Sequence, residues 1–157
     1  MKTSIFRICT VLAFGLAGSL LPAQERSRLE GLWDVSVTVT DCQTGAQIRT
    51  VRSLQMFRRD GSVLETANTA LRGISEGSWS RARWRVYDAT FWFFRYTLPS
   101  GAFASIAKIK DMITLNLDGD HFTSSGTVED FDANGNLIST GCFTHTANRL
   151  TDSEQQR

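Results

Sequence analysis

From Leu32 to Arg149, apolar and polar residues alternate with a period of two, and turn-forming residues interrupt the alternation. Successive side chains of a β-strand point to opposite faces, so this period is typical of strands with one buried face. No segment shows the three-to-four-residue spacing of an amphipathic helix. The pattern therefore predicts an all-β domain.

Three dipeptides mark tight turns between these runs: Asp60-Gly61, Asp118-Gly119 and Asn134-Gly135. Each suits a two-residue hairpin, because Gly, Asn and Asp tolerate positive φ angles. Pro99-Ser100-Gly101 predicts a fourth turn and residues 41–46 a fifth loop. The turns divide the chain into eight antiparallel strands, expected over residues 32–40, 47–58, 62–67, 77–82, 84–97, 102–117, 120–132 and 136–149.

Eight consecutive strands with short connections favour an eight-stranded antiparallel up-and-down barrel. Closure removes the unpaired edges that an open sheet would expose. An open two-sheet sandwich is the alternative.

The two glycine turns nearest the C-terminus predict strand register. Two-residue turns place Asp111 opposite Gly126 and Ser124 opposite His145, and directly opposed residues share a face. This largely apolar face is expected to be the interior. Its members are Ile109, Asp111, Ile113, Leu115, Leu117, Phe122, Ser124, Gly126, Val128, Phe143, His145, Ala147 and Arg149.

If the last strand closes on the first, nearly one antiparallel register brings Trp33 to Arg149 and Cys42 to Cys142. The third cysteine, Cys9, lies in residues 1–23, which are expected to be removed as a signal peptide. Cys42 and Cys142 then remain as an even number of cysteines in an exported protein, so a disulfide between them is expected.

Residues 1–23 have the layout of a cleavable signal peptide: Lys2 and Arg7, an apolar run, and small Ala23 before the expected cleavage point. The run is short for a membrane span. Residues 24–157 are then expected to form a single barrel domain with short disordered ends, in a secreted or periplasmic location. The formal net charge of +1, with scattered basic residues, gives no footprint for nucleic acid.

Gly31-Leu32-Trp33 at the start of the first strand, with Arg149 at the end of the last, resembles the signature of lipocalin-like (calycin) barrels. The resemblance implies that Trp33 closes one barrel end, that Arg149 packs across it, and that the interior binds a small apolar or amphipathic molecule. The helix after the last strand and the Thr-Asp-Tyr motif of many lipocalins are absent, and loop 41–46 is too short for a helical lid. Lidless barrels resembling avidins or allene oxide cyclases remain open.

Asp111, Ser124 and His145 are polar residues on the expected interior face, with Phe143 beside them. Buried polar groups are costly without partners, so they are expected to contact a ligand or one another. A Ser-His-Asp catalytic triad is disfavoured, because Ser124 does not lie in a G-x-S-x-G motif, which forms the strained turn that presents a nucleophilic serine. Acid-base chemistry by Asp111 and His145, in a cyclase or isomerase, is the enzymatic alternative. We assign no catalytic residue, cofactor or metal site.

The stretch from Tyr87 to Tyr96 is apolar on both faces. One face carries Phe91 and Phe93, and the other carries Trp92, Phe94 and Tyr96. The inward set would line the cavity, and Trp92, Phe94 and Tyr96 are expected as ligand contacts. The outward set would face a second copy of the chain or loop 68–76.

These observations predict an exported lipocalin-like barrel that binds a small apolar molecule. The alternatives are a barrel enzyme of cyclase or isomerase type, and an interaction module with a filled core.

Overall fold

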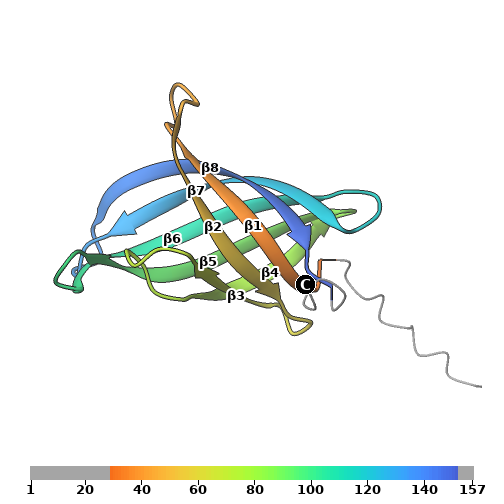
Figure 1. The fold of residues 1–157 in the computed structure, drawn as a ribbon, viewed down its shortest axis with the longest axis horizontal. Helices are drawn as coiled ribbons and strands as arrows, with labels where there is room; N and C mark the ends of the chain where they lie inside the picture. The colour runs from red at the N-terminus through yellow and green to blue at the C-terminus, as the bar shows by residue number, and fades with distance from the viewer. Residues whose placement is uncertain (1–28, 152–157) are drawn as a thin grey trace, which may run out of the picture.

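The computed structural model describes residues 29–151 (Figure 1). The expected signal peptide, residues 1–23, and the expected disordered ends lie outside the described residues.

Eight antiparallel strands close into one barrel in chain order, and β8 pairs back with β1. This confirms the all-β, eight-stranded barrel and excludes the sandwich. The strands are β1 (Gly31–Thr40), β2 (Gln47–Phe57), β3 (Ser62–Ala67), β4 (Ser75–Arg83), β5 (Val86–Thr97), β6 (Ala102–Leu115), β7 (His121–Phe131) and β8 (Leu137–Arg149).

The registers of the C-terminal hairpins and of the closing seam are confirmed. Asp111 lies opposite Gly126, Ser124 opposite His145, and Trp33 opposite Arg149. Side chains expected on one face therefore converge inside the barrel.

The glycine turns themselves are longer than expected. Asp132 N donates to Asn136 O and Gly135 N donates to Asp132 O, with a φ of 83° at Gly135, so the loop has three residues. The hairpin at Gly61 is built in the same way. A three-residue loop shifts the β7–β8 register by one, and an irregularity between Asp130 and Phe131 restores it.

Leu117 corrects the expected interior. Asn116 N donates to His121 O, so residues 117–120 form a four-residue loop instead of continuing the strands. The Leu117 side chain has left the sheet and is 70% exposed.

An aromatic plug closes the barrel end where β1 begins and β8 ends. Trp33 is fully buried, with its ring 4.8 Å from that of Phe122. The Arg149 guanidinium lies 4.3 Å from the centre of the Trp33 ring and donates to the carbonyls of Gly119 and Glu30. This arrangement is consistent with a calycin-like fold.

Cys42 and Cys142 form a disulfide, with Cα atoms 5.1 Å apart. The bridge joins the β1–β2 loop to β8. Cys142 is the β8 partner of Thr40 in the last pair of the β1–β8 ladder, and Cys42 follows Thr40 by two residues. The bridge therefore clasps the seam at which the barrel closes.

Candidate functional site

A cavity of about 340 Å³ occupies the half of the barrel away from the Trp33 plug. Its lining residues include Asn68, Thr69, Leu71 and Arg72 of loop 68–74, so it lies towards that end of the barrel. Loops 41–46, 98–101 and 132–136 connect the strands at the same end (Figure 1). The interior is therefore not filled by side chains. Most of the wall is apolar: Val37, Val39, Val51, Leu71, Phe91, Phe93, Ile109, Val128 and Phe143.

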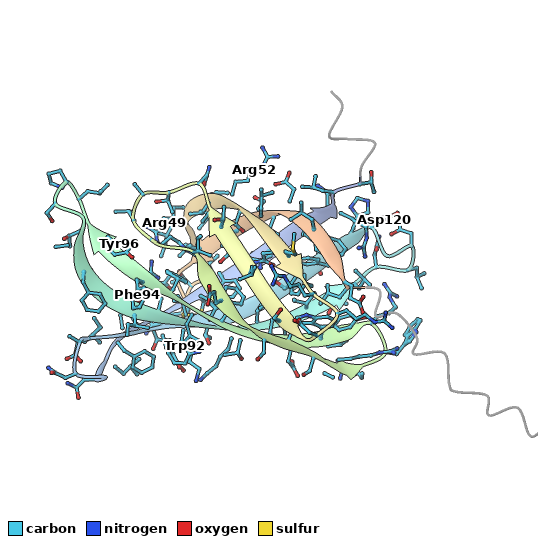
Figure 2. The ribbon with its side chains drawn as sticks, turned by 90° about the horizontal axis from the view of Figure 1, so that it is seen from below. Arg49, Arg52, Trp92, Phe94, Tyr96 and Asp120 are labelled. Atoms are coloured by element: carbon cyan, nitrogen blue, oxygen red, sulfur yellow. A yellow bond between two sulfur atoms is a disulfide. The ribbon has the colours of Figure 1, made fainter. Side chains whose placement is uncertain are left out.

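Strand β5 presents Phe91 and Phe93 to the cavity, and both are almost fully buried. Trp92 and Phe94 lie on the outside of the barrel, 41% and 51% exposed (Figure 2). The β5–β6 register decides this, because Ala89 pairs with Asp111 and so shares its inward face. Phe91 and Phe93, and not Trp92 and Phe94, are thus the walls that β5 contributes.

Tyr96 is also outside the set of cavity-lining residues. A register irregularity separates it from Arg95, and its hydroxyl lies against Gly73, 3.4 Å from where a Cβ there would sit. Tyr96 therefore packs against loop 68–74 instead of contacting the cavity.

The outward aromatic residues form a patch with neighbouring strands. The rings of Trp92 and Phe131 lie 6.0 Å apart, and those of Phe94 and Phe103 lie 6.2 Å apart. Loop 68–74 pairs with the end of β5, where Gly73 N donates to Phe94 O, and leaves the patch exposed. Association of two copies through this strand stays a prediction.

Asp111, Ser124 and His145 are brought together beneath the cavity, as the register arithmetic predicted. Ser124 Oγ donates to Asp111 Oδ2 at 3.1 Å, and His145 Nδ1 lies 3.2 Å from the same oxygen. The side chains of Asp111 and His145 are at most 3% exposed. His145 stacks on Phe143, 4.5 Å between ring centres, and both line the cavity.

The order of these groups does not match a nucleophilic relay. Such a relay places the histidine between serine and carboxylate, so that the imidazole takes the hydroxyl proton. Here the carboxylate is central and the Ser124 hydroxyl donates to it. His145 itself lies at the cavity wall beside Phe143, and its Nδ1 is close to Asp111 without making a hydrogen bond within residues 29–151.

Gly126 does not enlarge the cavity. A Cβ at this position would collide with the backbone carbonyl of Lys110 and lie 2.6 Å from the Phe143 ring. The absence of a side chain at Gly126 lets Phe143 and β6 approach closely, and these atoms occupy the volume that a side chain would have filled.

Charged residues at the cavity mouth were not singled out from the sequence. Arg49, Arg72, Arg95 and Glu65 all line the cavity. Arg72 pairs with Glu65 and also contacts Ser75 Oγ, while Ser75 Oγ donates to Glu65 at 2.8 Å. Alternation along β2 could have identified Arg49 from the sequence. Arg49 lies opposite Val39, and directly opposed residues share a face, so both point into the barrel.

Gln55 is a further buried polar residue on β2. Its side chain is fully buried, and neither amide atom has a hydrogen-bond partner within residues 29–151. Such groups are uncommon in folded proteins and indicate an interior that is not a purely apolar core.

Within the described part of the chain, no group of three or more His, Cys, Asp or Glu side chains is placed to hold a metal ion. The same residues include no helix that is long and apolar enough to cross a membrane.

Comparison of the chain with protein-family models, with curated proteins and with solved structures finds no match.

Proposed function

We propose that this chain is an exported barrel protein that binds one small apolar or amphipathic molecule in its interior. The observation that carries the proposal is the cavity of about 340 Å³ with aromatic and aliphatic walls. Its volume lies at the lower end of the range of small-molecule sites, which are mostly apolar with a few polar groups. The plug around Trp33 closes the far end and leaves the arginine-bearing end for entry.

Export is supported by two independent features. Residues 1–23 have the charge and apolar pattern of a signal peptide. The Cys42–Cys142 bridge is a covalent bond that persists in oxidising compartments such as the periplasm or the extracellular space.

His145 and Phe143 are proposed as direct ligand contacts, since both border the cavity. Asp111 lies behind His145, with its Oδ2 3.2 Å from His145 Nδ1, and Ser124 donates to that same oxygen. One polar group on an otherwise apolar floor would fix the orientation of a ligand without preventing the burial of its apolar part.

A fluorescence titration with N-phenyl-1-naphthylamine, an apolar dye that brightens on leaving water, tests the cavity. Wild-type protein is expected to saturate with one dye per chain. Ile109→Trp places an indole in the cavity and should weaken binding about tenfold or more, a loss of about 1.4 kcal/mol.

The matched control is Met112→Trp on the same strand, because Met112 faces outward and is 49% exposed. It should keep the wild-type affinity. Circular dichroism must show that both variants are folded. No saturable dye binding by the wild type, or equal binding by Ile109→Trp, would count against the proposal.

Acid-base catalysis is a second candidate, favoured by the 3.2 Å approach of His145 Nδ1 to Asp111 Oδ2 at the edge of an apolar cavity. Histidine and carboxylate side chains are the groups that most often transfer protons in enzymes. Extraction of the purified protein followed by mass spectrometry separates the two functions. A molecule recovered unchanged at one per chain supports binding, whereas its conversion during incubation supports catalysis.

A further inference from the structure

Three guanidinium groups converge at the cavity mouth from different parts of the chain: Arg49 from β2, Arg72 from loop 68–74, and Arg95 from β5. Arg72 and Arg95 both approach the Phe93 ring, with Cζ atoms 3.5 Å and 4.9 Å from its centre. The backbones of Arg72 and Arg95 also form a β-bridge. The cationic groups are therefore built into the mouth next to an aromatic wall.

Two carboxylates only partly balance these three cations. Glu65 pairs with Arg72, and Asp130 accepts from Arg95 Nε at 2.6 Å. Within the part of the chain that the structure describes, no carboxylate pairs with Arg49. The buried Arg72 Nε likewise has no hydrogen-bond partner there. The mouth thus keeps a surplus positive charge and an unused donor.

The electrostatics of Arg72 agree with this surplus. Burial lowers the pKa of its guanidinium, and repulsion from Arg95 and Arg49 lowers it further, against the opposing effect of Glu65. A further anion near Arg49 and Arg72 would relieve that repulsion. Carboxylates and phosphates are the groups that a planar guanidinium binds best.

Below the mouth, Phe91, Ile109 and Phe143 line the deeper part of the same cavity. We infer that the ligand is an amphipathic anion, whose carboxylate or phosphate headgroup binds between Arg49 and Arg72 while its apolar tail lies along these residues. The inference rests on the proposed binding function and names the class of molecule bound.

Competition against N-phenyl-1-naphthylamine tests the headgroup with three probes that share one tail: decanoate, decyl phosphate and 1-decanol. On wild-type protein the two anions should displace the dye at concentrations about tenfold below that of the alcohol. Added salt should narrow this difference, because it screens charges at an open mouth.

Arg49→Gln should bring the three probes to within about threefold of one another, when each is compared with the dye affinity measured on the same variant. Arg49 is exposed and unpaired with any described carboxylate, so the variant should fold. The matched control is Arg52→Gln on the same strand: it removes an equal charge from the outer face (Figure 2), where Arg52 pairs with Asp34. It should keep the wild-type preference for anions.

The outcomes separate the two proposals. If the dye binds but the three probes compete equally, the anionic headgroup is wrong and the apolar binding site stands. If the dye itself does not bind, the proposed function fails first. Inorganic phosphate could also remove the preference for the two anions over 1-decanol, at the concentrations at which decyl phosphate acts. In that case the arginines form a site for free phosphate, and the inference of an amphipathic ligand is wrong.

Discussion

At the scale of single residues, Ser124 illustrates how the barrel stabilises a buried charge. Its hydroxyl donates to the fully buried Asp111 carboxylate, and His145 Nδ1 lies 3.2 Å from the same oxygen. Ser124→Ala should lower the free energy of unfolding by about 1 to 3 kcal/mol, because a buried acceptor loses its donor. Urea unfolding measures this change.

Ser125→Ala is the matched control, since the neighbouring side chain is exposed on the outer face of β7. It should change stability by less than about 0.5 kcal/mol. Equal effects of the two substitutions would mean that the hydrogen bond to Asp111 contributes nothing measurable.

Gly31 is required by both its backbone and its neighbour. It has a φ of 130°, and a Cβ there would lie 2.7 Å from Arg149 Nη1. Gly31→Ala should cost about 3 kcal/mol by displacing Arg149 from Trp33 and straining the backbone. Gly45→Ala, at φ 71° with open space around it, should cost about 1 kcal/mol. The two losses of stability are measured by thermal or urea unfolding. Equal losses in Gly31→Ala and Gly45→Ala would mean that the contact with Arg149 contributes nothing to the requirement for glycine at position 31.

The candidate site was only partly predictable at this scale. Asp111, Ser124 and His145 follow from counting across two hairpins, because parity determines which side chains share a face. The inward set of β5 could not be assigned, since the turn at Pro99 left the register to β6 undetermined. Arg72 lies in an irregular loop, where no periodicity predicts the direction of a side chain.

At the scale of elements, aspartates organise four of the connecting loops. Thr44 N donates to Asp41, Ser62 Oγ to Asp60, Asp120 N to Asp118, and Asn136 Nδ2 to Asp132. Each of these hydrogen bonds is the main cause that holds the pKa of its carboxyl below the ordinary value. The ionised form of each aspartate therefore stabilises its loop.

These lowered pKa values predict acid sensitivity. A carboxyl whose folded pKa is depressed contributes stability above its unfolded pKa, near 3.9, and loses that contribution as the pH falls through the folded pKa. The free energy of unfolding should therefore drop below about pH 4. A variant with all four aspartates changed to asparagine keeps acceptors in the loops and should show a shallower drop. Parallel curves for the two proteins would contradict this origin.

The strands were predictable because one buried face imposes alternation along each of them, and their observed limits lie within two residues of the expected ones. Loop lengths were not predictable from the glycine dipeptides. Gly61 and Gly135 supply positive φ in three-residue loops as well as they would in two-residue turns. The β7–β8 register nevertheless agreed, because the irregularity at Asp130 compensates for the longer loop.

At the scale of the whole molecule, barrel closure depends on pairing β1 with β8, the elements farthest apart in sequence. The Cys42–Cys142 bridge spans 100 residues across this seam. Replacing both cysteines by serine should lower the free energy of unfolding by about 2 to 5 kcal/mol, mainly through the larger conformational entropy of the unfolded chain. A reductant should lower the urea midpoint of the wild type to that of the variant, and it should leave the midpoint of the variant unchanged.

The proposed function requires that the barrel interior hold one small molecule. Native mass spectrometry of the purified protein, incubated with a mixture of medium-chain alcohols and carboxylates, measures this most directly. We predict a single adduct per chain in the wild type and in Met112→Trp, and its loss in Ile109→Trp. A wild-type chain that stays bare, or an adduct that survives in Ile109→Trp, would contradict a ligand-binding interior.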